Sequence, residues 1–376
     1  MSRIYGSRKL EIAGGKGAVV WDADGNRYVD FMCGHGAALF GHVHPVLEKA
    51  LQDASHFPWT LGVGLSSPSR EKFMSSLSEL LPGGQVYFGN SGTEAVEAAL
   101  KLVIALNPGK KNILALRRGF HGRTIGALAL TFNPKYRKYW KDVLLPVTHV
   151  TPEELPDSID DDTAAVFVEP VQGEGGVFPM DCALAERINL ACSEKGAFLV
   201  ADEIQCGWGR CGSILASTSI GLDPHIVCLA KGVAGGLPIG VTLWKEEIGD
   251  FPAQGHGSTY GGNPFVSAVG LAALDLLQRE NLPALAREKG EMFRSRLASI
   301  DSPLIKDIRG MGILTGVELN SKSTRAVELL QERGVLALPA GPLVVRFMPP
   351  FVAEETDYDK VISVFGEVLE TMENEG

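Results

Sequence analysis

Near the middle of the chain the sequence reads Phe198-Leu199-Val200-Ala201-Asp202-Glu203, four apolar residues that run directly into two acids. A continuous apolar run of this length predicts a strand buried on both faces, as in a parallel sheet with helices on either side. Four further runs between Leu81 and Leu243 have the same character: Val86–Gly89, Asn112–Leu116, Ala164–Glu169 and Ile226–Lys231. The central sheet is therefore expected to be mostly parallel.

Helix-like stretches separate these apolar runs. Three of them are Thr93–Leu106, Gly119–Leu130 and Ala183–Lys195. Strands that alternate with helices indicate an α/β fold in which helices cover both faces of the central sheet. Ligands of such sheets bind beyond the carboxyl ends of the strands, so polar residues at those ends are the first candidates for a site.

The pattern changes beyond Gly261. Two long helical stretches, shorter strands and a closing helix follow, at Pro264–Glu280, Pro283–Ile300, Ile305–Arg309, Ile313–Leu319, Val344–Phe347 and Glu355–Glu373. Near the other end, Ala18–Phe31 predicts a hairpin that turns at Asp24-Gly25-Asn26. We predict a large cofactor-binding domain at residues 46–260 and a smaller α+β domain at residues 261–376, which residues 1–45 complete as an N-terminal segment.

Composition excludes several classes of protein. With 376 residues, of which 45% are hydrophobic, the chain is long enough for two domains with sizeable cores. A formal net charge of −10 argues against nucleic acid as the main partner, and no apolar run is long enough to span a bilayer. Met1–Leu10 lacks an apolar signal sequence and the six cysteines have no framework spacing. We therefore predict a cytoplasmic protein with reduced thiols and no membrane partner.

The segment Asn90-Ser91-Gly92-Thr93-Glu94 lies between a predicted strand and a predicted helix. Ser91 and Glu94 have the spacing of a capping box, and Gly92 allows backbone amides to approach a ligand closely. Together with the helix dipole, the amides and two hydroxyl groups would seat a phosphate. An ordinary capped helix has the same pattern, so this segment alone leaves both interpretations open.

Two charged residues end neighbouring apolar runs. A carboxylate at Asp202 would hold a protonated pyridinium nitrogen and so maintain an electron sink, although strand-end acids also bind loop amides. An ammonium at Lys231 above an apolar floor would lose solvation and acquire a lowered pKa, which suits a Schiff-base lysine. A lysine with a solvated head group has the same sequence. Asp202, Lys231 and a phosphate seat in one sheet are together much stronger evidence for a cofactor site than any one of them alone.

Six segments in register resemble the class III, or ornithine-type, aminotransferases. They are NSGTEAVEAALK (90–101), FHGRT (120–124), EPVQGEGG (169–176), ADEIQCGWGR (201–210), AKGVAGGLP (230–238) and GHGSTYGGNP (255–264). The resemblance begins at VWDADGNRYVDF (20–31) and extends to RFMPPF (346–351), so it covers nearly the whole chain. It implies a pyridoxal 5′-phosphate (PLP) enzyme of fold type I that forms a homodimer with active sites shared between the subunits.

The resemblance implies a role for each matching residue. Lys231 is similar to the lysine that carries PLP as a Schiff base and moves the proton, and Asp202 to the partner of the pyridine nitrogen. The other implied cofactor contacts are Ser91, Gly92 and Thr93 at the phosphate, Phe120 on the ring face, Gln205 at the phenolic oxygen, and Ser258 and Thr259 at the phosphate of the partner subunit. For the substrate, Arg123 and Arg346 resemble two carboxylate-binding arginines, and Glu174 resembles the acid that masks Arg346. The planar fork of arginine matches a carboxylate in two hydrogen bonds.

The resemblance also implies a substrate class. FHGRT together with Glu174 and Arg346 favours transfer of a terminal (ω) amino group, with glutamate and 2-oxoglutarate as the other pair. The stretches 33–42 and 131–138 resemble an archaeal-type subgroup that acts on lysine or ornithine attached to a small acidic carrier protein, LysW. Acetylornithine aminotransferase is the nearest alternative, and ornithine or 4-aminobutyrate enzymes are further ones. Two different classes are also open: a PLP racemase or aminomutase, and an inactive binding protein. The presence of both Lys231 and Asp202 argues against the inactive protein.

Two local features bear on partners. Residues 133–141 hold Lys135, Arg137, Lys138 and Lys141 and no acid, which would attract an acidic carrier beside the active site. A solvated loop has the same composition, and the subgroup resemblance weighs more than the patch. His35, His42 and His44 invite a metal site, but the segment from Gly41 to Pro45 resembles the loop that leads into the first long helix of the family. We therefore predict no metal.

Overall fold

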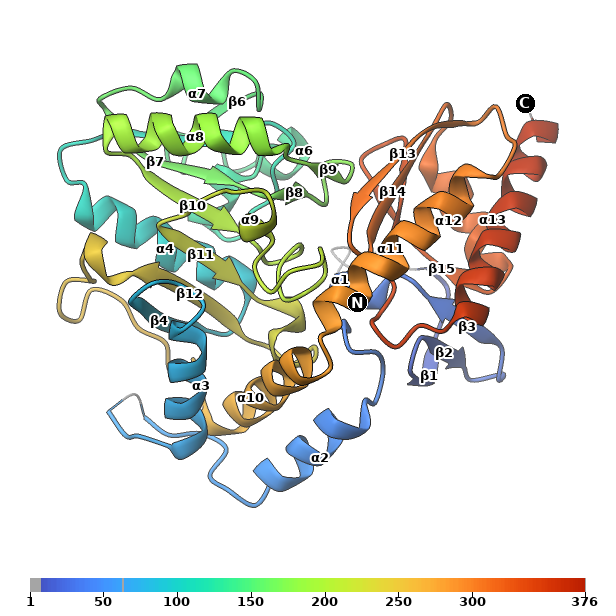
Figure 1. The fold of residues 1–376 in the computed structure, drawn as a ribbon, viewed down its shortest axis with the longest axis horizontal. Helices are drawn as coiled ribbons and strands as arrows, with labels where there is room; N and C mark the ends of the chain where they lie inside the picture. The colour runs from blue at the N-terminus through green and yellow to red at the C-terminus, as the bar shows by residue number, and fades with distance from the viewer. Residues whose placement is uncertain (1–7, 63, 376) are drawn as a thin grey trace.

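The computed structural model describes residues 8–62 and 64–375, so the part of the N-terminal prediction that concerns residues 1–7 lies outside it. At its centre is a seven-stranded sheet in the order β4-β12-β11-β10-β7-β5-β6 (Figure 1). In that order the strands are Gly84–Gly89, Gly240–Lys245, Ile226–Leu229, Phe198–Asp202, Thr163–Val168, Asn112–Leu116 and Thr148–Val150. Only β12 runs antiparallel to its neighbours. The prediction of a mostly parallel central sheet is confirmed, and β12 is an element that the sequence pattern did not separate.

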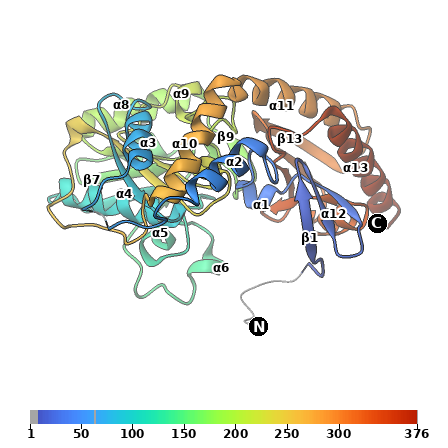
Figure 2. The same cartoon turned by 90° about the horizontal axis from the view of Figure 1, so that it is seen from below.

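Alternate residues of each strand enter different cores. In β5, Leu114 and Leu116 belong to one hydrophobic cluster, while Ile113 and Ala115 belong to another. The first cluster includes α2 (Pro45–Ala54), α3 (Pro68–Ser78), α8 (Cys182–Lys195) and α10 (Pro264–Arg279), and the second includes α4 (Gly92–Leu106) and α5 (Ile125–Leu130). In Figure 2 α8 and α4 lie on opposite sides of the sheet. Helices therefore cover both faces, as expected.

Shorter elements fill the connections of this larger body. They are α1 (Cys33–Gly36), α6 (Pro134–Arg137), α7 (Leu155–Ser158), α9 (Ala216–Ser219), the two-stranded ribbon of β8 (Val171–Gln172) and β9 (Phe178–Pro179), and the 3-10 turns η1 (Lys231–Ala234) and η2 (Glu246–Ile248). Most of the site residues described below lie in connections that follow the strands.

The remainder of the chain forms two small sheets with three helices. One sheet has the order β13-β14-β17-β16, at Ile305–Met311, Leu314–Leu319, Val344–Phe347 and Leu338–Ala340. The other has the order β1-β2-β3-β15, at Ile12–Lys16, Val19–Asp22, Arg27–Asp30 and Val335–Leu336. Helices α11 (Leu282–Ala298), α12 (Ser323–Glu332) and α13 (Glu355–Glu375) pack on them around a third hydrophobic cluster. This part is the smaller α+β unit that the sequence predicts.

The N-terminal strands are held by the C-terminal part of the chain. The predicted hairpin forms from β2 and β3, and its turn is closed by the backbone N–H of Asn26, which donates to Asp22 Oδ1 at 2.8 Å. Strand β3 then pairs in parallel with β15, so Val29 lies opposite Val335. Arg8 Nη2 donates to the carbonyl oxygen of Ala337 at 2.9 Å, across 329 residues of sequence. Each small sheet therefore depends on the late part of the chain.

Helix α10 packs with the larger body. Its residues Val266, Val269 and Ala273 are buried in the first of the two clusters that cover the central sheet. In the predicted division this helix falls within residues 261–376, the segment assigned to the smaller domain. The boundaries of the three predicted segments remain a prediction.

The predicted helix at 119–130 is wrong in its first half. Helix α5 begins only at Ile125, because the backbone N–H of Phe120 donates to Glu169 Oε1 at 2.9 Å and that of His121 donates to Thr131 Oγ1 at 2.9 Å. Gly122 has a φ of 138°, a conformation that an L residue rarely adopts. The segment is instead a loop whose amides are bound by side chains.

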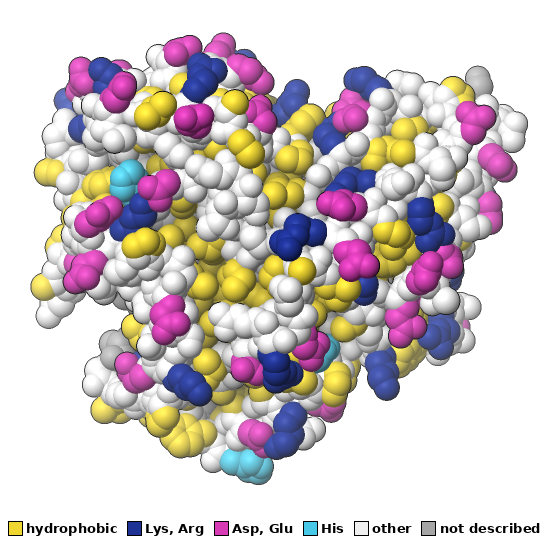
Figure 3. Space-filling view, viewed as in Figure 1, with side chains coloured by type: hydrophobic (Ala, Val, Ile, Leu, Met, Phe, Trp, Pro, Cys, Tyr) yellow, Lys and Arg dark blue, Asp and Glu magenta, His cyan; other side chains and the backbone are white. Residues whose placement is uncertain are grey.

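Side chains are distributed as expected for an α/β protein. On the face shown in Figure 3, hydrophobic side chains gather where the two parts of the molecule meet, and charged side chains of both signs cover the outer regions. Within the described residues no helix combines the length and the apolar character that a membrane span requires.

Candidate active site

A cavity of about 410 Å³ lies at the carboxyl ends of β10 and β11. Most of the predicted site residues line it: Ser91, Gly92, Thr93, Phe120, Arg123, Glu174, Asp202, Gln205 and Lys231. Arg346 lies behind this lining, whereas Ser258 and Thr259 line a neighbouring cavity. The structure therefore brings residues from five separate connections into one site.

Lys231 begins the turn η1 directly after strand β11 and Ala230. Its φ of 47° places the backbone in the left-handed region, where residues other than glycine are strained. Burial lowers the pKa of the Lys231 ammonium below its ordinary value; the negative charge of Glu174 opposes this shift, and the positive charge of Arg346 adds to it. A lysine with a lowered pKa more readily provides the neutral amine that a nucleophile requires.

Asp202 ends strand β10 and is 3% exposed. Its Oδ1 accepts from the backbone N–H of Ile204 at 3.1 Å, and its Oδ2 lies 2.8 Å from His121 Nδ1. Burial alone would lower the pKa of His121, but the hydrogen bond to Asp202 and the charges of Asp202 and Glu169 raise it above its ordinary value. The raised pKa favours the protonated form of His121, whose charge would support the carboxylate of Asp202.

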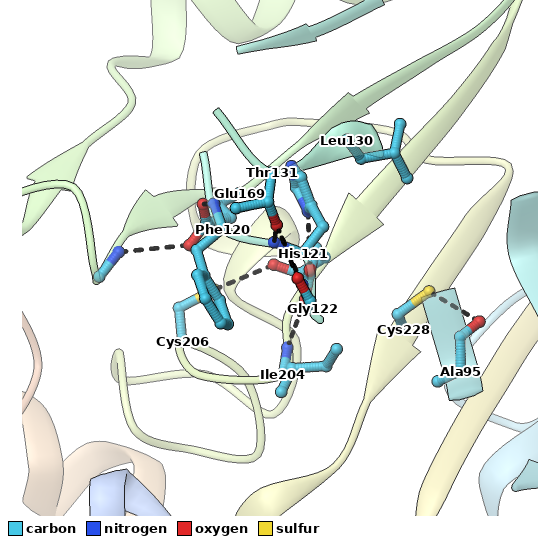
Figure 4. Close-up of polar contacts among 12 residues, drawn as sticks. Ala95, Phe120, His121, Gly122, Leu130, Thr131, Glu169, Ile204, Cys206 and Cys228 are labelled. Atoms are coloured by element: carbon cyan, nitrogen blue, oxygen red, sulfur yellow. Dashed lines mark hydrogen bonds and ion pairs between the residues drawn. The ribbon is translucent and has the colours of Figure 1, made fainter. Parts of the chain in front are cut away.

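His121 is a residue that the sequence interpretation missed. It lies in the FHGRT segment, beside the assigned Phe120, but only the structure shows that it contacts Asp202. Figure 4 shows His121 among Phe120, Thr131 and Glu169. Its side chain is 0% exposed and its Nε2 has no partner among the described residues. Among the described residues, the imidazole is therefore held through Nδ1, by its contact with Asp202.

Glu169, the residue directly after strand β7, closes the same cluster. Its carboxylate accepts from the backbone N–H of Phe120 at 2.9 Å and from that of Gly173 at 3.3 Å. Burial raises the pKa of Glu169 to about 7, although the charge of His121 opposes the shift. Glu169 fixes the loop that carries Phe120, so that ring is positioned at the wall of the cavity. No role was predicted for this residue.

The N-terminus of α4 faces the cavity as predicted. Ser91 caps the helix, since its Oγ accepts from the backbone N–H of Glu94 at 3.3 Å, and Glu94 in turn binds the backbone N–H of Asn90. A Cβ on Gly92 would lie 2.9 Å from Ile204. The first turn therefore packs closely under the cavity and directs its amides, with the hydroxyls of Ser91 and Thr93, towards one side of it.

Arg346 in β17 is 1% exposed. Its Nη2 lies 2.7 Å from Glu174 Oε1, and its Nη1 donates to Gln205 Oε1 at 2.7 Å. Burial raises the pKa of Glu174, but the charges of Arg346 and Lys231 outweigh burial and lower it overall, so the carboxylate is ionised. The structure thus places Glu174 against Arg346, with Gln205 as a second partner, and the masking role of Glu174 stays a prediction.

Gln205 itself is held by close packing. A Cβ on Gly173 would lie only 1.8 Å from Gln205 Oε1, so no larger residue fits at that position without displacing the amide. The amide oxygen of Gln205 accepts from Arg346, and the Gln205 side chain also hydrogen-bonds the carboxylate of Glu174, so Gln205 belongs to the cluster that covers Arg346. The predicted contact of Gln205 with the phenolic oxygen of the cofactor stays a prediction.

Arg123 also lines the cavity. Its guanidinium carbon is 4.0 Å from the centre of the Tyr136 ring, and the same ring makes an edge contact with Phe120 at 6.2 Å between centroids. Tyr136 comes from the short helix α6, so it links Arg123 to the surface of the molecule. The sequence pattern gave no indication of this contact.

Ser258 and Thr259 do not line the cavity that contains Lys231. Ser258 Oγ accepts from Asn90 Nδ2 at 3.0 Å, and Thr259 is exposed. Both line a second cavity that also includes Asn90, Glu94 and Glu97. Within the single chain, Ser258 and Thr259 therefore line a different cavity from Ser91, Gly92 and Thr93.

The donor set of the cavity fits PLP. An amine of lowered pKa, a buried carboxylate, an aromatic ring and a hydroxyl-lined helix N-terminus match an aldehyde, a pyridine nitrogen, a heteroaromatic face and a phosphate, respectively. Within residues 8–62 and 64–375, the structure has no group of three or more His, Cys, Asp or Glu side chains arranged to hold a metal ion. His42 instead pairs with Asp30 at 2.8 Å, and His44 caps α2.

Comparison with known proteins supports this assignment. The class III aminotransferase family matches residues 2–369. A LysW-aminoadipate semialdehyde transaminase of Deinococcus radiodurans is 40% identical, over 98% of this chain and 88% of its own length. An acetylornithine aminotransferase of Bacillus anthracis is 35% identical, over 98% of this chain and 96% of its own length. The crystal structure of the ornithine aminotransferase from Toxoplasma gondii has a TM-score of 0.94 at 30% identity, over 100% of this chain and 94% of that chain.

These matches confirm the family, the fold type and the cofactor that the sequence predicts. The coverage leaves no large part of the chain outside the family. The chain belongs to the class III aminotransferases and is a PLP-dependent aminotransferase of fold type I.

Proposed function

We propose that this enzyme transfers a terminal (ω) amino group, with glutamate and 2-oxoglutarate as the other pair, in cytoplasmic lysine or arginine biosynthesis. The favoured substrate is lysine or ornithine attached to the acidic carrier protein LysW, and acetylornithine is the alternative. The observation that carries the proposal is Arg346, a buried cation covered by Glu174 and Gln205. The name of the Deinococcus radiodurans relative supports the carrier-linked form.

A covered arginine suits an enzyme with two unlike substrates. Glutamate brings a carboxylate next to the amine that reacts, whereas an ω-amine brings only methylene groups to that place. An exposed Arg346 beside methylene groups would be desolvated without a partner, which is costly. We propose that Glu174 covers Arg346 while the ω-amine is bound and moves aside for the carboxylate of glutamate. Arg123 would hold the distal carboxylate of glutamate.

The catalytic roles follow from the same geometry. When bound, PLP supplies an electron sink for the carbon that loses or gains the amino group. We propose that Lys231 binds the aldehyde carbon of the cofactor and moves the proton of the reacting carbon, since its amine lines the cavity and its pKa is lowered. Asp202 would hold the pyridine nitrogen, Phe120 the ring face, and Ser91, Gly92 and Thr93 the phosphate.

The mask over Arg346 predicts opposite effects of two substitutions. Glu174→Gln is expected to slow the ω-amine half-reaction and to spare the glutamate half-reaction, because Arg346 loses its charged partner only in the former. Arg346→Ala is expected to slow the glutamate half-reaction most. A lost charged hydrogen bond of about 1–3 kcal/mol corresponds to a rate change of about 5- to 160-fold. Stopped-flow absorbance of bound PLP with glutamate, and separately with acetylornithine, measures each half-reaction.

A matched control is Glu318→Gln. Like Glu174, Glu318 is a partly buried acid that pairs with an arginine. It lies in the smaller unit, 2.7 Å from Arg309, and outside the cavity. It is expected to change both half-reactions by the same small factor. Equal losses in both half-reactions for Glu174→Gln and Arg346→Ala would remove the basis of the proposal.

We also propose that the enzyme is a homodimer with shared sites. Several large apolar side chains are exposed on the single chain, among them Phe57 (50%), Trp59 (64%), Leu65 (59%) and Tyr260 (60%). Exposed apolar side chains of this size favour coverage by another surface, and most oligomers are symmetric pairs of one chain. Tyr260 adjoins Ser258 and Thr259, which lie outside the cavity of their own subunit. A second copy would thus bring these hydroxyls to the partner's phosphate.

Shared sites predict complementation between two inactive enzymes. Lys231→Ala subunits and Thr259→Tyr subunits, the latter with a blocked phosphate contact, should each be inactive as pure dimers. Dimers mixed by refolding are expected to regain up to one intact site out of two, because each chain supplies what the other lacks. Tagged chains isolate the mixed dimers, and transamination of acetylornithine measures the gain. Isolated mixed dimers without any activity would contradict shared sites.

A further inference from the structure

The α6 surface is a compact cationic area in an acidic protein. We define it as residues 134–147, which follow α5 and project from the larger body in Figure 2. Lys135, Lys138 and Lys141 are exposed. Arg137 is partly buried, and its Nη1 lies 3.5 Å from Nδ1 of His149. Asp142 is the one acid in this range. A cationic area in a chain of net charge −10 attracts anions selectively to one place on the molecule.

The same surface exposes large apolar side chains. Tyr139 is 76% exposed, Trp140 50% and Val143 61%. Beside them lies an open cavity of about 570 Å³. Its lining combines basic and aliphatic side chains, among them Arg137, Lys138, Lys141, Leu144, Leu145 and Val147. Aromatic, aliphatic and basic groups together are typical of a protein docking site, whereas a surface that only keeps a protein in solution needs no exposed tryptophan.

The α6 surface reaches the active site through Tyr136. Its ring contacts the Arg123 guanidinium at 4.0 Å and the Phe120 ring at 6.2 Å, and both of these residues line the active-site cavity. The neighbouring residues Lys135, Lys138 and Tyr139 are exposed to solvent. A polypeptide bound on this surface would therefore lie next to the cavity that contains Lys231.

We infer that the α6 surface is the docking site for an acidic segment of the polypeptide to which the ω-amino substrate is covalently attached. This inference rests on the proposed function. Positive charges at the mouth of the cavity would increase the encounter rate with an acidic carrier, and the exposed aromatic side chains would hold it. A small acylated amino acid would need only the cavity and would be indifferent to this surface.

Three substrates with the same reacting end test the inference. They are a polyglutamate peptide that ends in a C-terminal lysine, the polyglutamine analogue, and Nα-acetyllysine; in each one the ε-amine is free. The test variant is Lys135→Glu/Lys138→Glu/Lys141→Glu. The matched control is Lys16→Glu/Lys72→Glu/Lys111→Glu, which makes the same charge change at exposed lysines elsewhere. Glutamate formation from 2-oxoglutarate gives kcat/KM for each pair.

The wild-type and control enzymes are expected to prefer the acidic peptide over the neutral one by about tenfold or more at low salt. The test variant should lose that preference, and salt should abolish it in the wild type, because the Debye length falls to about 3 Å at 1 M. Nα-acetyllysine should react equally with all three enzymes. Titration of Trp140 fluorescence with a polyglutamate peptide that lacks lysine should show binding to the wild type and not to the test variant.

The outcomes separate the docking inference from the proposed function. If Nα-acetyllysine and both peptides all fail to react with the wild type, the lysine form of the proposed function is wrong. The same three substrates with ornithine in place of lysine then test the ornithine form, and the fluorescence titration still decides docking. If Nα-acetyllysine reacts but the acidic peptide has no advantage, or if the test variant keeps that advantage, the docking inference is wrong. A change of sedimentation coefficient in the test variant alone would show that this surface joins two copies of the chain, which would also overturn the inference.

Discussion

The Lys231→Ala enzyme is expected to lose at least about 10⁴-fold in kcat, the upper end of the effect of removing a group that transfers protons. The same side chain is proposed to bind the cofactor covalently, so a second contribution disappears with it. The absorbance that PLP has when joined to a lysine should vanish, while the phosphate contacts at the start of α4 should still bind the cofactor. Absorbance spectra and transamination of acetylornithine measure both effects.

A second buried lysine provides the control. Lys245 in β12 is 8% exposed and pairs with Asp223 at 2.6 Å, far along the strand from the cavity end. Lys245→Ala should lower the thermal midpoint yet retain the absorbance of lysine-bound PLP and most of the activity. Wild-type turnover in Lys231→Ala would refute the catalytic assignment, and loss of both properties in Lys245→Ala would point to a general loss of folding.

Asp202→Ala is expected to lower kcat by about 10²–10³-fold, the usual effect of removing one preorganised electrostatic partner at a reacting group. Asp202→Glu should lose less, because the charge remains. The structure adds a second readout, since Asp202 is the main group that raises the pKa of His121. In Asp202→Ala burial then dominates, the pKa of His121 should fall, and the imidazole should become neutral at neutral pH.

NMR of His121 in enzyme labelled at histidine follows that pKa directly. His225 is a useful internal reference, because burial lowers its pKa and neither Asp202 nor His121 is among the groups that shift it. A fall in the pKa of His121 with no change in kcat would show that Asp202 organises the fold but is not required at the cofactor. If neither the pKa of His121 nor kcat changed in Asp202→Ala, the proposed contact of Asp202 with His121 and its role at the cofactor would both be wrong.

Much of the fold follows from local pattern. The interiors of the runs at 112–116, 164–169 and 198–202 are apolar because both faces of these strands are covered, and polar residues occur only at the ends of the runs. This property can be read from the sequence alone. Strand β12 has the same buried pattern but runs in the opposite direction. Direction depends on connections rather than on composition, so the sequence pattern did not distinguish it.

The candidate site was predicted where residues end strands or helices. Asp202, Lys231 and Ser91 occupy such positions, and their locations in the structure agree with that expectation. His121 and Tyr136 were not found, because their importance arises from contacts with residues distant in sequence. The segment 119–124 contains two glycines, and Gly122 has a φ of 138°, which a helix excludes. The side chains of Glu169 and Thr131 bind the amides of Phe120 and His121 and so fix the loop.

The pairing of the N-terminal strands with the late part of the chain also affects how each newly made chain folds. The contact between Arg8 and Ala337 joins residues 329 positions apart, and β3 finds its partner β15 at a similar distance. At a synthesis rate of about 5–20 residues per second, the N-terminal hairpin waits roughly 20 s to one minute for these partners. During that interval the edge of β3 is open to other strands. Assistance by a chaperone that shields β-strand edges during translation should therefore matter more for this enzyme than its final stability suggests.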